Sequence, residues 1–237
     1  VKKLNCFPCG SFESCKNGSC EVDQSKKDQV AFQEIKSAVN YYSDQIDSIE
    51  RNINQISNSY RTDLNSCGVQ YSNEIDWLES IYKPEIERLY DEITSEASKG
   101  LWANCMWVGD LWDTQQTYKE QYSTALTNAE RTLNDCINRA RSNYSYYING
   151  YRNAINKHKS WLNELLEELQ PLSVSDKNSL QNRIRSLEEK LDSLNSKITE
   201  IGNYSISYTT PESKLSSVKR LIDEERNYIW EHSSCGG

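Results

Sequence analysis

The residues of this chain with the most evident chemistry are cysteines. Four of the eight lie within one short N-terminal stretch, at Cys6, Cys9, Cys15 and Cys20. Four thiolates can bind zinc tetrahedrally, whereas four thiols in an oxidising compartment form two disulfides. Zinc sites typically use two C-x-x-C pairs, and only Cys6 and Cys9 have that spacing. The spacing therefore favours disulfides, with zinc at these four cysteines as the alternative.

Catalytic groups are scarce elsewhere in the chain. The two histidines, His158 and His232, are not part of an H-E-x-x-H or Glu-x-x-His arrangement. No glycine-rich phosphate loop, G-x-S-x-G motif or EF-hand spacing occurs. A cysteine nucleophile would need a histidine that only the fold could bring close. We therefore expect a protein that is not an enzyme, with no catalytic residues and no cofactor besides the alternative zinc.

Three of the six tryptophans, Trp102, Trp107 and Trp112, lie in one short segment with the only methionine. Exposed tryptophans are common at binding sites and at membrane interfaces. No basic residue lies between Leu101 and Tyr118 to attract anionic lipid. The pattern favours a buried aromatic plug that closes a turn between two helices, and the alternative is a protein-binding patch. These three residues are our candidates for contact with a partner.

These groups must be positioned by helices, because apolar residues recur at intervals of three and four from Phe32 to Tyr60. That spacing is typical of a coiled-coil seam. Isoleucine occupies both core positions of the heptad, which disfavours a two-stranded coil and favours three or four helices. The pattern leaves open whether the seam is filled within the chain or between copies of it. The seam residues are Phe32, Ile35, Val39, Tyr42, Ile46, Ile49, Ile53, Ile56 and Tyr60.

The rest of the chain has similar periodic segments, which predict about five helices in total. Gly68 is expected to cap the first helix or act as a hinge, and Pro84 to kink or restart the second. Thr210 and Pro211 are expected at the first positions of the last helix, after an extended linker. The predicted helical segments are residues 28–66, 71–93, 114–169 and 180–201 and the helix that begins near 210.

The predicted fold is an all-α, elongated, antiparallel helical bundle or coiled coil with a small Cys-rich N-terminal segment. Hydrophobic residues make up only 36% of the chain, which suits long amphipathic helices better than a compact core. We expect a Cys-rich cap at residues 1–26 and a long bundle at 27–202. Residues 203–237 should form a linker, a C-terminal helix and a flexible tail that Cys235 could tie down.

An antiparallel hairpin also predicts one long-range disulfide. If the Trp-rich turn joins two helices, Cys67 lies opposite a residue near 145, within a few helical turns of Cys136. We therefore add Cys67 and Cys136 to the disulfide candidates.

Charge and hydropathy limit the partners. The net charge is −8 without a basic block, which argues against nucleic acid. No apolar run is long enough for membrane insertion. The chain starts at Val1, and no apolar signal-peptide core follows the lysines at positions 2 and 3.

Two functions fit these observations. The first is a non-catalytic structural or assembly protein that self-associates or docks in a larger assembly, such as a virion tail, collar or fibre or an extracellular lattice or filament. The alternative is a secreted recognition protein that binds a ligand or receptor through its Trp and Tyr clusters. Both place the protein in a virion or outside the cell, with protein partners.

Overall fold

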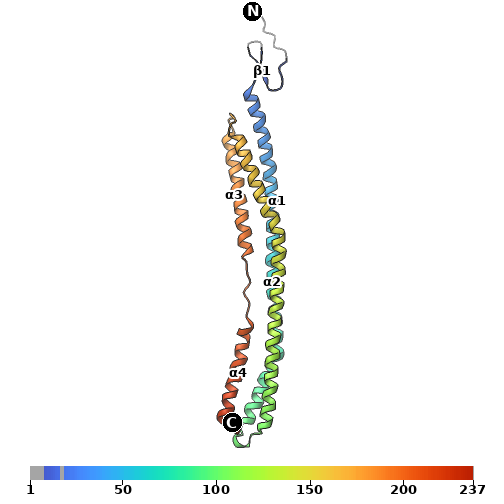
Figure 1. Cartoon of the computed structure of the whole chain (residues 1–237), viewed down its shortest axis with the longest axis vertical. Coiled ribbons are helices and arrows are strands. Elements are labelled where there is room, and N and C mark those ends of the chain that lie inside the picture. The colour runs from blue at the N-terminus through green and yellow to red at the C-terminus, as the bar shows by residue number, and fades with distance from the viewer. Residues whose placement is uncertain (1–7, 17–18, 237) are drawn as a thin grey trace, which may run out of the picture. The chain divides into compact units, whose positions relative to one another are not determined.

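The computed structural model describes residues 8–16 and 19–236, which are mostly helical (Figure 1). A two-stranded antiparallel sheet, β1 (Glu13–Lys16) and β2 (Ser19–Val22), precedes four long helices. Two single 3₁₀ turns, η1 (Gly100–Trp102) and η2 (Ser234–Gly236), follow α1 and α4 respectively. The long helices are α1 (Gln24–Ala97), α2 (Cys105–Leu169), α3 (Lys177–Gly202) and α4 (Pro211–His232).

Helix α1 runs without interruption through Gly68 and Pro84, so one helix replaces the two predicted there. The space beside Gly68 is used by packing, because a Cβ there would lie 3.3 Å from the Cδ1 atom of Ile206. Pro84 is exposed, whereas Leu78 and Ile86 on either side are buried. Proline inside a helix costs roughly 3 kcal/mol, and burying each large aliphatic side chain contributes about 1.5–3 kcal/mol. The free energy gained by burying side chains on the inner face of α1 therefore exceeds the cost of the proline.

Helix α2 starts nine residues earlier than the sequence predicts, at Cys105 rather than Thr114. The Asn104 side chain accepts a hydrogen bond from the Trp107 amide at 3.2 Å, which satisfies a donor of the first turn. Val108 and Leu111 are buried in a core cluster with residues of α1 and α4. These contacts hold the additional turns.

The chain divides into two units, each built from two separate stretches of sequence. Unit 1 comprises residues 1–59 and 143–203, and unit 2 comprises residues 60–142 and 204–237. Each unit contains part of α1, part of α2 and one shorter helix, which is α3 in unit 1 and α4 in unit 2. Three helical segments therefore form the core of each unit.

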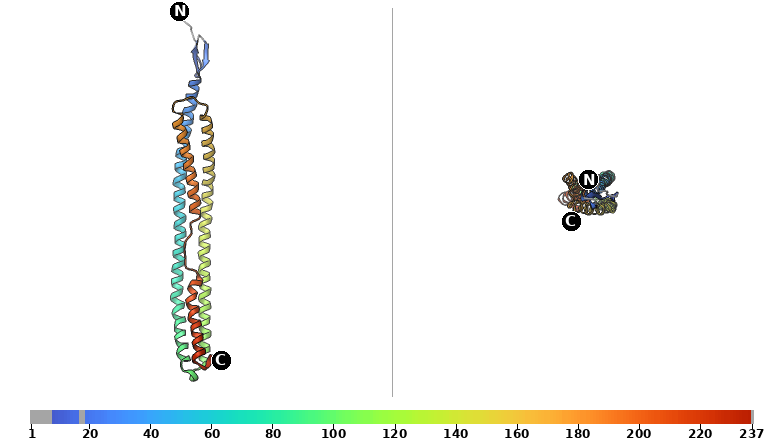
Figure 2. Two further views of the ribbon diagram at one scale, coloured as in Figure 1. Left: turned by 90° about the vertical axis from the view of Figure 1, so that its left-hand side faces the viewer. Right: turned by 90° about the horizontal axis from the view of Figure 1, so that it is seen from above.

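In unit 1, α3 lies beside α1 and α2 (Figure 2). Lys159 of α2 bonds Asp192, whereas the earlier Tyr144 bonds the later Ile198 carbonyl, so α2 and α3 are antiparallel. Polar pairs join α1 to α3 with increasing numbers on both helices, so these two are parallel.

Apart from Tyr60, which belongs to unit 2, the predicted seam of α1 lies in this unit. The fully buried seam residues are Val39, Ile46 and Ile53, which are 0% exposed, and they pack in a core that α2 and α3 of the same chain complete. Two seam positions differ from the prediction, because Tyr42 and Ile56 are only half-buried. Ser57 is buried next to Ile56, so the inner face of α1 shifts by one residue there.

In unit 2, α1 and α2 form an antiparallel hairpin around the turn at 98–104. Gln115 donates to the Ile86 carbonyl at 3.3 Å, and the rings of Tyr82 and Tyr122 lie 5.5 Å apart. Helix α4 runs parallel to α1, with the Lys214 ammonium 3.0 Å from the Glu79 carboxylate. The core includes Leu64, Ile75, Ile86, Leu89 and Ile93 of α1, Val108, Leu111, Tyr122, Leu126 and Leu133 of α2, and Leu215, Val218, Ile222 and Ile229 of α4.

The segment before α4 is extended, as the sequence predicts, and it is held by tyrosines. Tyr71 donates to the Thr209 carbonyl at 2.8 Å, and Tyr204 donates to Asn65 at 3.1 Å. Thr210 caps α4 by accepting from the Ser213 amide at 3.4 Å, with Pro211 at the first helical position. The predicted start of this helix is confirmed.

Candidate functional site

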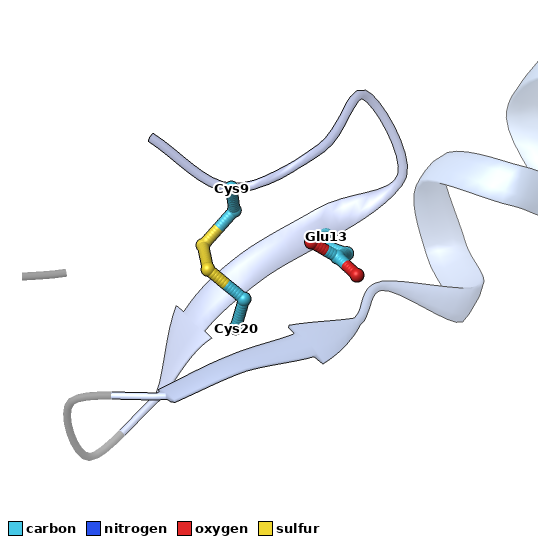
Figure 3. Close-up of side chains that lie close together, drawn as sticks. All are labelled: Cys9, Glu13 and Cys20. Atoms are coloured by element: carbon cyan, nitrogen blue, oxygen red, sulfur yellow. A yellow bond between two sulfur atoms is a disulfide. The ribbon is translucent and has the colours of Figure 1, made fainter. Parts of the chain in front are cut away.

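The N-terminal cysteines belong to a disulfide-bonded hairpin. The sulfurs of Cys9 and Cys20 are bonded at 2.03 Å, with the Glu13 carboxylate close by (Figure 3). The Gly10 amide donates to this carboxylate at 2.9 Å. Cys15 is also disulfide-bonded, and Cys6 lies outside the described residues.

This hairpin also contains one group of potential metal ligands. The ligand atoms of Cys9, Glu13 and Cys20 all lie within 4.8 Å of one another. Zinc binding requires thiolates, and the disulfide uses both sulfurs. As long as Cys9, Cys15 and Cys20 all stay disulfide-bonded, none of them offers a thiolate to the alternative zinc site.

Two further disulfides hold unit 2. Cys67 and Cys136 are bonded at 1.99 Å, which is the pairing that an antiparallel hairpin predicts. Cys105 and Cys235 are bonded at 2.15 Å and tie the residues after α4 to the first turn of α2. The sequence did not lead us to this second pair. This pair could have been inferred by elimination, because Cys105 and Cys235 are the two cysteines that remain once the N-terminal four and the pair Cys67–Cys136 are assigned.

The Trp-rich segment forms an exposed apolar surface at the turn of unit 2, which we call the tip. The tip consists of Leu101, Trp102, Met106 and Trp107, whose exposed fractions are 87%, 89%, 77% and 49%. The buried-plug interpretation is therefore wrong for Trp102 and Trp107. Trp112 differs, because it is partly buried and packs against the core cluster of α1, α2 and α4.

A network of polar contacts gives the backbone of the tip a defined conformation. Gly100 has a φ of 62°, a left-handed conformation that glycine adopts without strain. The Glu96 carboxylate pairs with Lys99 and accepts from the Asn104 amide at 3.0 Å. The hydrogen bond from the Lys99 side chain and, to a smaller extent, that from the Asn104 amide lower the pKa of Glu96, so this carboxylate stays charged. The Cys105–Cys235 disulfide adds a covalent link immediately next to the tip.

Residues close to the tip carry charges of both signs. Asp110 and Asp113 follow it on α2, and Glu96 pairs with the nearby Lys99. Anionic lipid surfaces attract basic segments. Residues 100–117, which include the tip, contain no lysine or arginine that would do this. Within residues 8–16 and 19–236, no helix is both long and apolar enough to cross a membrane.

The two histidines lie in aromatic contacts. His158 is buried in unit 1 against Tyr42 and Trp161, with ring centroids 5.6 and 5.2 Å away. Burial and, to a smaller extent, the positive charge of Lys157 lower the pKa of His158, so its ring is neutral at pH 7. His232 stacks on Tyr228 at 4.2 Å. All cysteines of the described chain are in disulfides, so none offers a thiol nucleophile.

Unit 2 contains a buried carboxyl group that sequence reasoning missed. Glu225 is 0% exposed on the inner face of α4, and neither carboxyl oxygen makes a hydrogen bond of normal geometry with a described residue, although the Gln115 side chain lies close to it. Burial raises its pKa to about 7, and the neighbouring Gln115 side chain offsets this only in part. A gap in the apolar pattern could have indicated this burial. Ile222 and Ile229 are seven residues apart on the inner face of α4, so a residue between them must also face inward.

In comparisons with known proteins, no family model, no curated protein and no solved structure matches the chain.

Proposed function

We propose that this chain is a non-catalytic, disulfide-stabilised helical recognition protein that binds a protein partner through the tip of unit 2. The observation that carries this proposal is the exposure of Leu101, Trp102, Met106 and Trp107 on a turn held by a disulfide. Aromatic residues and methionine are enriched at protein interfaces. A turn whose backbone is already ordered loses little backbone entropy on binding.

Burial of the α1 seam favours this role over a self-associating rod. The argument for self-association was that apolar faces along the chain need other copies to cover them. In unit 1 the core residues Val39, Ile46, Ile53, Ile184 and Leu191 are all 0% exposed without another copy. A structural role in a virion or an extracellular lattice remains the alternative, with the tip as the surface that another copy would contact.

The scaffold of unit 1 fits coiled-coil packing. Three polar contacts join α1 to α3 at intervals of seven residues on each helix, which is the heptad period. They are Asn40 with Arg183 at 2.6 Å, Asp47 with Lys190 at 2.7 Å and Asn54 with Lys197 at 2.5 Å. We infer that the helices of unit 1 supercoil in this register.

The cysteine pairing supports an extracellular or virion-surface location. All seven cysteines of the described residues are disulfide-bonded. Disulfides persist in oxidising compartments and are rare in the cytosol. The net charge of −8 argues against nucleic acid as the partner.

Site-specific photo-crosslinking in the cells or particles that display the chain tests this proposal. A benzophenone amino acid replaces Trp102 in one variant and Trp77 in a control variant. Trp77 is a suitable control because it is 59% exposed on α1 of the same unit, outside the tip. We expect a discrete adduct with another protein from position 102 only, and its loss when Leu101→Ser and Met106→Ser are added.

Two outcomes decide against recognition. An adduct of the chain with itself from position 102 supports the assembly role instead. Equal adducts from positions 102 and 77 show that the tip has no special affinity.

A further inference from the structure

A pocket lies in unit 2 between the start of α2 and the end of α4. Its volume is about 340 Å³, close to the lower end of the range of roughly 300–1,000 Å³ that is usual for small ligand sites. The Cys105–Cys235 disulfide forms part of its wall. The covalent link joins the two elements that line the pocket, so it limits their separation.

The lining is apolar and aromatic. Val108 and Ile229, which are 4% and 8% exposed, form part of the lining and belong to the core cluster. Trp112 contributes from α2 and Trp230 from α4, and Trp230 is 64% exposed. Gly109 leaves room at the pocket, because a Cβ there would meet no atom within 4 Å. A large apolar side chain can therefore enter.

Of the residues that the structure describes, Arg226 is the one charged side chain that lines this pocket. Among the described residues no carboxylate lies within 4.0 Å of its guanidinium, whereas the nearby Arg220 pairs with Glu224. A guanidinium binds carboxylates through two parallel hydrogen bonds. The pocket thus offers an apolar cavity and an available cation side by side.

We propose that this pocket binds an apolar side chain, aromatic or branched, together with an adjacent carboxylate of a partner polypeptide. The carboxylate pairs with Arg226 while the apolar group contacts Trp112, Trp230 and Val108. This inference rests on the proposed function, because it specifies what the partner presents next to the tip.

A pair of small probes tests the pocket on the complete chain. N-acetyl-phenylalanine carries a phenyl ring and a carboxylate, and N-acetyl-phenylalaninamide is its neutral counterpart. Nitrogen-15 NMR spectra report the Gly109 amide and the indole groups of Trp112 and Trp230. We expect saturable shifts confined to these signals, with the amide binding about tenfold more weakly because it lacks the charge-assisted pair with Arg226.

Three variants separate the contribution of the Arg226 charge from that of the apolar cavity. Arg226→Gln should weaken binding of the acid about tenfold and leave binding of the amide unchanged. Gly109→Leu should abolish binding of both probes by filling the pocket, and it should not impair the helix, since glycine is the poorer helix former. Arg220→Gln removes a matched exposed arginine from the same helix and should change neither probe's affinity.

Equal affinity for the two probes, or an unaltered affinity for the acid in Arg226→Gln, overturns the proposal. So do shifts that lie outside the pocket. The outcome is separable from that of the proposed function, because Trp102→Ser should leave probe binding intact. A chain that binds the acid but gives no adduct from the tip retains the pocket and refutes the recognition role.

Discussion

The buried carboxyl group of Glu225 makes the stability of unit 2 depend on pH. Its pKa is about 7 in the folded chain, against 4.5 for an exposed glutamate. The folded state therefore binds more protons than the unfolded state between these two values. The contribution of this group to stability is fully present below pH 4.5 and is lost as the pH rises through 7, because burial disfavours the charged form.

The size of the effect follows from the shift of the pKa. Each unit corresponds to about 1.36 kcal/mol, so the free energy of unfolding should fall by about 3 kcal/mol between pH 4.5 and pH 8 on account of this group. Glu225→Gln replaces it with a neutral side chain of the same shape. The variant should match the parent chain at pH 4 and exceed its stability by about 3 kcal/mol at pH 8.

Urea unfolding with intact disulfides, followed by circular dichroism at pH 4, 6 and 8, measures this difference. Subtracting one chain from the other cancels titrations that both share. Glu224→Gln is the matched control, because Glu224 is exposed on the same helix and pairs only at 3.8 Å with Arg220, so its effect should be small at each pH. A difference for Glu225→Gln that stays constant with pH, or a variant less stable than the parent at pH 8, would refute the reasoning.

Three further predictions concern the packing of each unit. Replacing Cys67 and Cys136 by serine should lower the free energy of unfolding by about 4 kcal/mol, since the disulfide closes a sequence separation of 69 residues; calorimetry measures the loss, and an unchanged transition temperature would contradict it. Tyr144→Phe removes a buried hydrogen bond of 2.8 Å to α3 and should cost about 1 kcal/mol in urea unfolding, whereas Tyr146→Phe at an exposed position should cost nothing. Ile53→Ala should cost about 2–5 kcal/mol while the chain stays monomeric in sedimentation; a dissociating oligomer would instead mean that the seam is shared between copies.

Periodicity predicted the helices well because burial follows it closely. Every predicted seam residue of α3, from Leu180 to Ile201, is buried, and α4 begins at the cap that the sequence indicates. A helix end at Gly68 and a restart at Pro84 were wrong, because tertiary packing keeps α1 continuous there. There the neighbouring residues of α1 are held by buried contacts that no local pattern records.

The candidate sites were less predictable, because exposure depends on which helix covers which face. The spacing of Trp102, Trp107 and Trp112 is compatible with either burial or exposure; in the structure the first two are exposed and Trp112 is partly buried. The sequence did not predict burial of Glu225, because a glutamate is rarely buried without a partner and is therefore expected at the surface. The distance between Cys67 and Cys136 could be estimated from helix geometry, whereas Cys105 and Cys235 meet only because of how α4 docks.

The Cys105–Cys235 link determines what a single break in the chain can release. The segment from Tyr204 to Thr209 is extended and largely exposed, with aromatic residues that chymotrypsin recognises. A cut there separates α4 from α3 in sequence, yet α4 stays attached to α2 through the two sulfurs. The nicked protein keeps its full mass until a reductant is added, so the loss of a C-terminal fragment requires both a protease and a reducing environment.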